Sequence, residues 1–234
     1  MDDFFSRSEA LLGEKAMEAL RSCRVIIFGV GGVGSYAAEA LIRTGLTHLT
    51  IVDGDTVQPS NINRQLPATR ATMGLPKVEA LKARLLEINP EAEINAVGEF
   101  YHAGSESFNF QLSSFNYIID AIDNVNDKVD LIINATRAHA KIFSSMGAAL
   151  RFDPTQVTTG ELMVIKGDAL AKAVRARMKK LDRYPSKKVR CVYSTEQAKH
   201  CETRGSLMQV TAVFGLTLAS MVVNDLRIKI ENIE

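Results

Sequence analysis

A glycine-rich run between a buried strand and a helix constrains this chain more than any other feature. The run reads FGVGGVGSYAAEAL and contains the spacing G-x-G-x-x-G at Gly29, Gly31 and Gly34. The apolar stretch RVIIF precedes it, and small and apolar residues follow it as in a helix. A strand, tight turn and helix start of this kind place backbone N–H groups where they can bind a phosphate. The run therefore predicts a nucleotide-binding fold, although by itself it fits NAD and ATP equally well.

The alternation of strands and helices extends this prediction to the whole chain. Further strands are expected at 47–53, 92–97, 116–121 and 140–145, and helices at 77–88 and 125–139. This pattern predicts an α/β fold with a Rossmann-like, mainly parallel sheet and helices on both faces. After residue 147 we expect strands at 157–165 and 189–193, a helix at 168–180 and a long helix at 207–230. We interpret 1–147 as the nucleotide-binding core and 148–234 as an elaboration of the same sheet, so that 1–234 form a single domain.

Composition and cysteine spacing favour a cytoplasmic protein. The chain has 234 residues, of which 46% are hydrophobic, and it can bury a sizeable core without disulfides. Its three cysteines, Cys23, Cys191 and Cys201, form no C-x-x-C pair, and the N-terminus has no signal-peptide pattern. The apolar segment Leu207–Val223 is shorter than the ~20 residues of a usual membrane span. We expect a core or subunit-interface helix there, with peripheral membrane association as the alternative.

One basic window stands apart from the balanced charge of the chain. The segment from Lys172 to Arg190 holds nine basic residues and one acidic residue, Asp182, whereas acidic residues outnumber basic ones elsewhere. Such a window can hold a polyanion, or it can be a solvated helix face. Charge alone leaves both readings open.

Polar residues that follow successive predicted strands distinguish an ATP-binding site from an NAD-binding site. Asp53 ends the second strand, where a carboxylate can bind ribose hydroxyls. Behind it, Asn61 and the planar fork of Arg64 suit phosphate oxygens, and Lys77 adds a point charge. Asp123 follows the fourth strand and offers an oxygen ligand for Mg²⁺. Each residue also has a simpler interpretation: a surface ion pair for Arg64, a solvated lysine for Lys77, a helix cap for Asp123.

The ordered motifs carry a family resemblance. GVGGVGS, D-x-D, SNINRQ, G-x-P-K, INP and DAIDN resemble the ThiF/HesA/MoeB adenylyltransferases, relatives of ubiquitin-activating enzymes, from about Ser6 to Gly147. The resemblance implies ATP-dependent adenylation of a carboxylate with release of pyrophosphate. It implies a nucleotide site formed by Gly29, Gly31, Gly32, Gly34, Asp53, Asp55, Asn61, Arg64, Gln65, Lys77, Asp123 and Asn124. Within this set, Arg64, Lys77 and Asp123 would act in catalysis, with Asp123 as the Mg²⁺ ligand.

The same resemblance implies a homodimer. The stretch FFSRSEALLG resembles a family motif whose arginine is delivered to the neighbouring subunit, and Arg7 matches its second arginine. The first arginine of that motif is replaced by Phe4. Arg7 is therefore expected to act in trans.

The C-terminal motifs resemble one branch of the family. MGAALRFDPTQVTTGEL, DALAKAVRARMKKL, VYSTE and GSLMQVTAVFGLTLAS resemble the tRNA threonylcarbamoyladenosine dehydratases. That branch implies adenylation of the threonylcarbamoyl carboxylate of a modified adenosine beside the anticodon, followed by ring closure with loss of AMP. The segment Lys172–Arg190 then becomes a candidate surface for tRNA, not DNA, with a sulfur-transfer protein as a further candidate partner.

Other functions remain open on the sequence alone. Sulfur-carrier-activating relatives usually bear two C-x-x-C pairs, which this chain lacks, so we expect no zinc. Cys191 or Cys201 could serve as an acyl-accepting nucleophile, although ring closure within the substrate needs none. The alternatives are activation of a ubiquitin-like sulfur carrier for thiamine or molybdopterin synthesis, a non-catalytic nucleotide-binding scaffold, and an NAD dehydrogenase.

Overall fold

A computed structural model describes residues 4–102, 112–138, 140–199, 201, 203 and 205–232. Seven strands form one sheet in the order β3-β2-β1-β4-β5-β7-β6. All neighbouring strands are parallel except β6 and β7, which are antiparallel. The strands are β1 Arg24–Phe28, β2 His48–Val52, β3 Glu93–Val97, β4 Tyr117–Asp120, β5 Lys141–Ser145, β6 Val157–Glu161 and β7 Arg190–Ser194. The predicted mainly parallel, Rossmann-like sheet is confirmed.

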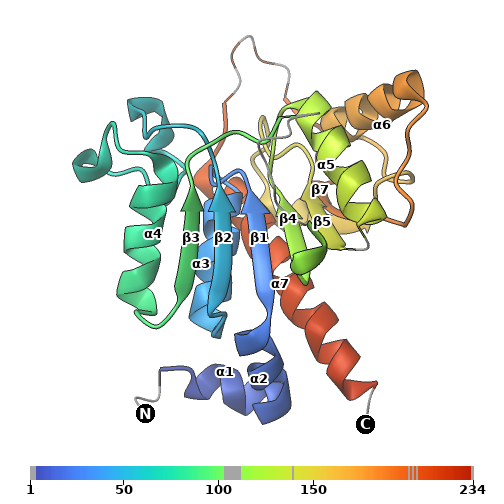
Figure 1. The fold of residues 1–234 in the computed structure, drawn as a ribbon. Coiled ribbons are helices and arrows are strands. Elements are labelled where there is room, and N and C mark those ends of the chain that lie inside the picture. Colours follow the sequence, from blue (N-terminus) through green and yellow to red (C-terminus); the bar gives the residue numbers. More distant parts are fainter. Residues whose placement is uncertain are drawn as a thin grey trace.

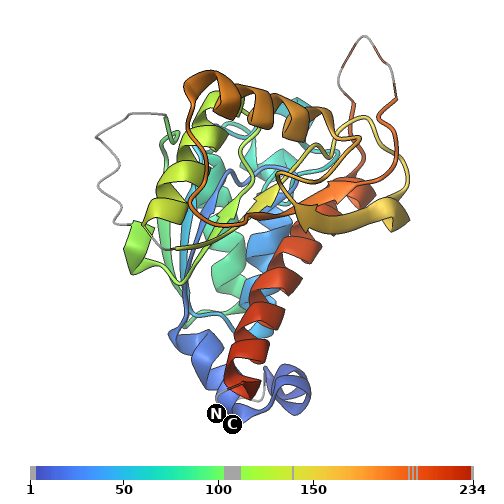
Figure 2. The same cartoon turned by 90° about the vertical axis from the view of Figure 1, so that its right-hand side faces the viewer.

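Helices cover both faces of this sheet, as predicted, because each face is apolar and must be buried. One core lies between the sheet and α2, α3, α4 and α7, and the other between the sheet and α5 and α6. Figure 2 shows α5 in yellow-green and α7 in red on opposite sides of the sheet. The helices are α1 Ser6–Leu12, α2 Glu14–Ser22, α3 Gly34–Thr44, α4 Lys77–Ile88, α5 Val125–Arg137, α6 Ala169–Leu181 and α7 Met208–Glu231.

Two element boundaries differ from the sequence prediction by more than one residue. The strand expected to reach Ile165 ends at Glu161, since Val164 and Ile165 donate backbone hydrogen bonds back to the Glu161 carbonyl in a tight turn. The apolar side chains that suggested a longer strand, Leu162 and Ile165, instead belong to the core beneath α5 and α6. Helix α5 ends at Arg137, and His139, included in the predicted helix, lies outside the described residues.

The apolar segment Leu207–Val223 forms most of α7, which packs as a core helix. The helix is long and apolar enough to cross a membrane, but 56% of its most apolar window is buried inside the protein. It crosses α3 closely at Gly215, where an added Cβ would lie 2.3 Å from the Val33 carbonyl oxygen. The apolar composition of α7 is therefore explained by packing against α3 and the sheet.

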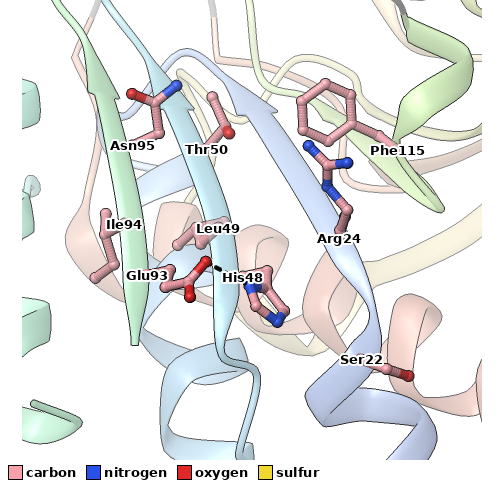
Figure 3. Close-up of a pocket in the computed structure, with 9 residues that line it drawn as sticks. All are labelled: Ser22, Arg24, His48, Leu49, Thr50, Glu93, Ile94, Asn95 and Phe115. Carbon is pink, nitrogen blue, oxygen red and sulfur yellow. Dashed lines mark hydrogen bonds and ion pairs between the residues drawn. The ribbon is translucent and has the colours of Figure 1, made fainter. Parts of the chain in front are cut away.

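The sheet has two chemically different edges. In Figure 1 the carboxyl ends of the strands point upward, whereas α1, α2 and the end of α7 lie below the amino ends. Near the amino ends, side chains of β1, β2 and β3 line a groove of about 630 Å³ (Figure 3). A second, larger cavity opens at the carboxyl ends and contains most of the residues singled out by sequence.

Candidate active site

The larger cavity lies at the position where the strand order reverses. It measures about 740 Å³ and is lined by Phe28 and Gly29 after β1 and by Ala121 to Asp123 after β4. In open α/β sheets this switch point, outside the carboxyl ends of the strands, is where ligands bind. A cavity of this volume holds a nucleotide-sized ligand.

The glycine loop has the geometry of a phosphate cradle. Gly29 has φ +85°, and a Cβ on it would lie 2.8 Å from the Ala121 carbonyl oxygen. A Cβ on Gly34 would lie 1.9 Å from the Gly29 carbonyl oxygen, so neither position admits a side chain. The loop therefore keeps its backbone N–H groups accessible at the start of α3, as phosphate binding requires.

Asp53 holds the glycine loop against the next strand end. One carboxylate oxygen accepts the Val30 N–H at 2.8 Å, and the other accepts the Asp55 N–H at 2.9 Å. The side chain is buried yet lines the cavity. Carboxylate oxygens have further lone pairs, so both bonds leave capacity for a ribose hydroxyl. The sequence predicted the ribose role alone, whereas the structure adds a role in shaping the loop.

Lys77 begins α4 and is paired inside the cavity. Its ammonium lies 2.6 Å from the Asp55 carboxylate, and the Lys77 side chain is only 7% exposed against 53% for Asp55. The simple interpretation of a solvated lysine is therefore wrong. An ammonium has three N–H donors, so Lys77 can keep Asp55 and still bind a phosphate oxygen.

The SNINRQ loop places three side chains opposite the glycine loop. Arg64 uses one terminal nitrogen for the Ser60 carbonyl and the Asn63 side chain, both at 2.8 Å. Within the described residues its other nitrogens have no hydrogen-bond or ion-pair partner, so the guanidinium fork is available to a ligand. No acidic partner of Arg64 is found in the described part of the chain, so the surface ion-pair interpretation has no support there.

The other two side chains of this loop differ in their partners. Asn61 is buried, and its side-chain oxygen accepts the Gln58 N–H at 3.0 Å. Gln65 is also buried, and its side-chain oxygen has no hydrogen-bond partner among the described residues. Because an unpaired buried oxygen costs about 1–3 kcal/mol, Gln65 has the character of a ligand-binding group.

Asp123 and Asn124 follow β4 and have different roles. Asn124 caps α5, since its side-chain oxygen accepts the Asn126 N–H at 2.9 Å and the Asp127 N–H at 3.2 Å. Asp123 is exposed at the cavity and has no hydrogen-bond or ion-pair partner within the described part of the chain. The helix-cap interpretation of Asp123 is therefore wrong, and its carboxylate is available to a cation.

Two predicted residues do not line the cavity. Gly34 is not part of the cavity lining but permits the tight turn, because a Cβ on it would collide with the Gly29 carbonyl oxygen. Arg7 lies on α1, at the opposite edge of the sheet (Figure 1), so the structure of one chain does not bring it to the site. The other predicted site residues all line the cavity.

The comparisons with known proteins cover nearly the whole chain. The model of the ThiF family matches residues 5–231. The chain belongs to the ThiF family. It is 40% identical to the tRNA threonylcarbamoyladenosine dehydratase of Bacillus subtilis over 75% of this chain and 69% of that protein. It is 34% identical to the dehydratase of Escherichia coli over 89% of this chain and 79% of that protein.

The fold of this ThiF-family chain also matches a solved structure with ATP. The crystal structure of the Escherichia coli tRNA N6-threonylcarbamoyladenosine dehydratase in complex with ATP has a TM-score of 0.89 and 33% identity, covering 98% of this chain and 96% of that chain. By contrast, the molybdopterin-synthase adenylyltransferase of Salmonella typhimurium is 34% identical over 59% of this chain and 54% of that protein. The match to the dehydratase therefore includes the C-terminal part of this ThiF-family chain.

Several cavity residues were missed by sequence reasoning. Phe100 and Tyr101 follow β3: the Phe100 ring covers Gly54, and the Tyr101 ring packs edge-on to Phe28 at 5.2 Å. The rule that ligand-binding residues follow strand ends could have found both. Thr211 comes from α7, and its hydroxyl oxygen would lie 3.3 Å from a Cβ on Gly32. No local signal marks Thr211, because it reaches the site only when α7 packs on α3.

The buried cysteines lack the properties of a nucleophile. Burial raises the pKa of the Cys191 thiol to about 12 and that of the Cys23 thiol to about 12. At neutral pH both are protonated, whereas the thiolate is the reactive form. Cys201 is exposed and does not line the cavity. Within the described residues, no group of three or more His, Cys, Asp or Glu side chains could hold a metal ion.

Proposed function

We propose that this chain is an ATP-dependent tRNA threonylcarbamoyladenosine dehydratase that acts in the cytoplasm. The observation that carries the proposal is the combination of an adenylation cavity with a whole-length match to an ATP-bound dehydratase. The reaction begins when the threonylcarbamoyl carboxylate attacks the α-phosphorus of ATP and pyrophosphate leaves. The carbamoyl nitrogen then attacks the acyl carbon, AMP leaves, and a ring closes. The net change in the nucleoside is the loss of one water.

The residues of the cavity suit the first step. Negative charge builds on the phosphoryl oxygens, so catalysis depends on positioning and charge neutralisation. Arg64 contributes its available fork and Lys77 its buried ammonium. No general base is needed for the attacking carboxylate, because it is already ionised at pH 7.

Mg²⁺ fits the cavity as a phosphate-bound ion. This ion usually takes one or two protein carboxylates and completes its shell with phosphates and water. Asp123 supplies one unpartnered carboxylate beside the loop that would hold the phosphates. When bound, Mg²⁺ would neutralise charge on the triphosphate.

We propose that the protein works as a homodimer in which Arg7 of the partner subunit completes each site. Helix α1 buries none of its own residues and exposes 84% of Leu11, and Phe4, just before the helix, is 73% exposed. Exposed apolar groups of this kind favour a protein–protein contact. Mixing Arg7→Ala subunits with Arg64→Ala subunits should restore AMP formation, since one site of the mixed dimer has both arginines. No restoration after subunit exchange would refute action in trans.

The basic segment supports tRNA as the substrate. Five of its lysines are exposed, from Lys172 on α6 to Lys188 in the following loop. Two other residues of this loop bond α5: Arg183 pairs with Asp130 at 3.3 Å, and the Ser186 hydroxyl donates to the Thr136 carbonyl at 2.7 Å. The lysines are therefore presented from a surface anchored to α5, and their positive charge suits contacts with phosphates.

One experiment tests the reaction directly. The protein is incubated with ATP, Mg²⁺ and threonylcarbamoyl-modified tRNA, and the nucleosides are then weighed by mass spectrometry under conditions that preserve the ring. A nucleoside lighter by one water, formed together with AMP, supports the proposal. Pyrophosphate release that depends on a sulfur-carrier protein instead of tRNA would favour the alternative adenylyltransferase.

A further inference from the structure

A buried ion pair joins two segments of the cavity wall outside the glycine loop. The Arg151 guanidinium lies 3.0 Å from the Asp168 carboxylate, and the two side chains are 2% and 0% exposed. Both residues line the cavity, Arg151 in the segment after β5 and Asp168 immediately before α6. None of the nucleotide-site residues described above bonds to this pair.

Arg151 fixes the segment after β5 through the backbone. Its guanidinium donates to the carbonyls of Gly147 at 2.8 Å and Ser194 at 3.2 Å, and also to the Glu196 carbonyl. The preceding residue, Leu150, has φ +63°, a left-handed conformation that a leucine adopts only when its surroundings hold it there. The wall is therefore held in one defined geometry.

Asp168 ties the same wall to α6. One carboxylate oxygen accepts the Gly147 N–H at 3.1 Å together with the Arg151 bond. The other oxygen caps α6 by accepting the Ala171 N–H at 2.9 Å. A single carboxylate thus bonds the cavity wall and the first turn of the helix that begins the basic segment.

We propose that Arg151 and Asp168 form a positioning pair that sets where tRNA bound on α6 presents its carboxylate to the cavity. This inference rests on the proposed function and on tRNA binding by the basic segment. The pair acts on the tRNA side of the reaction, because its bonds go to α6 and to the wall after β5. It holds neither Arg64 nor Lys77, so ATP binding does not depend on it.

Asp168→Asn is the most informative variant. Asparagine caps helices as well as aspartate does, so α6 keeps its cap while the ion pair is lost. We expect AMP formation in a single turnover with modified tRNA to slow about 10- to 100-fold, since small misplacements of reacting groups have effects of this size. Affinity for ATP alone should stay within about twofold of wild type. Arg84→Gln is the control, because it breaks the Arg84–Glu39 pair, whose residues do not line the cavity.

A second variant helps to distinguish a loss of positioning from a folding defect. Arg151→Lys keeps a positive charge for Asp168 but loses the planar fork that reaches the carbonyls, and we expect a rate between wild type and Asp168→Asn. Thermal melting and ATP titration are measured for every variant. An Asp168→Asn rate equal to wild type would overturn the inference, and so would a parallel loss of ATP affinity, which would indicate a purely structural role.

Failure of the proposed function has a different signature. In that case the wild-type protein binds ATP but forms no AMP with modified tRNA. That result removes the reaction on which the pair acts and overturns both proposals. A slow Asp168→Asn variant beside an active wild type with equal ATP affinity supports both.

Discussion

The two hollows at opposite edges of the sheet have similar volumes but different chemistry. The cavity at the carboxyl ends measures about 740 Å³ and the groove at the amino ends about 630 Å³. In the groove, His48 lies 3.0 Å from Glu93, and the Arg24 guanidinium lies over the Phe115 ring at 5.5 Å (Figure 3). Size alone therefore does not distinguish a ligand site.

The cavity differs because loops supply many of its polar groups. Within the described residues, its unpaired groups include the Arg64 fork, the Asp123 carboxylate and the buried Gln65 oxygen, each on a connection that follows a strand. The groove has neither a glycine loop nor a helix N-terminus among its lining residues. The comparison shows that a buried unpaired oxygen, on Gln65, and accessible backbone N–H groups mark the functional edge of this sheet.

The largest expected effect comes from removing an arginine side chain in the cavity, and an arginine removed from the groove serves as the comparison. Arg64→Ala should reduce AMP formation with modified tRNA at least ~100-fold, because a group that stabilises transition-state charge is lost. Arg24→Ala, in the groove, should leave the rate within about twofold of wild type, since the comparison predicts no ligand there. Pyrophosphate release measures both. Equal losses in the two variants would break the comparison.

A methyl group added to the glycine loop should be nearly as damaging. In Gly34→Ala the new Cβ meets the Gly29 carbonyl oxygen, so the turn must open at a cost of about 1–3 kcal/mol. We expect a lower melting temperature and at least a ~10-fold loss of ATP affinity by calorimetry, as the N–H groups leave their positions. Gly98→Ala is the matched control, because its Cβ would find its nearest neighbour at 3.9 Å. Unchanged ATP binding in Gly34→Ala would contradict the prediction that the glycine loop binds the phosphates of ATP.

A smaller effect is expected when exposed charge is removed from α6. Lys179→Gln combined with Lys180→Gln should weaken tRNA binding several-fold and reduce the slope of log K against log salt by about 1–2. ATP affinity should not change, because neither lysine lines the cavity. Arg24→Gln, an exposed charge at the other edge, serves as the control. If both changes weaken tRNA binding equally, the basic segment is not the tRNA surface.

The smallest effect concerns the buried cysteine of β7. Since the pKa of Cys191 is raised to about 12, only about one thiol in 10,000 is ionised at pH 8. Iodoacetamide at that pH should modify exposed Cys201 and leave Cys191 unmodified, as read by peptide mass spectrometry. Cys191→Ala should cost roughly 1 kcal/mol of stability through a small cavity and leave the dehydration rate within about twofold. A larger loss of rate at unchanged stability would reinstate a catalytic role for Cys191.

Much of the local structure could be predicted from the sequence because the signals are local. The helix predicted from Lys77 to Ile88 has these same limits in the structure, and α6, predicted at 168–180, spans Ala169–Leu181 with Asp168 as its cap. The prediction was wrong where apolar residues continue past a strand, as at Leu162 and Ile165, because periodicity does not distinguish a core-facing turn from a strand. Most cavity residues that the sequence identified follow strand ends, although Phe100 and Tyr101, which follow β3, were missed. Thr211 was missed because only packing brings it to the site.

The sequence by itself determined the nucleotide-binding class of fold and most groups of the candidate site. These properties depend on glycine spacing, strand ends and residue chemistry within short segments. Only the tertiary structure decided that β7 lies between β5 and β6, that Thr211 of α7 reaches the glycine loop, and that Arg151 pairs with Asp168. Such contacts join residues that are distant along the chain, and they are selected by close packing and by the need to satisfy buried polar groups. Neither requirement leaves a mark in local sequence periodicity.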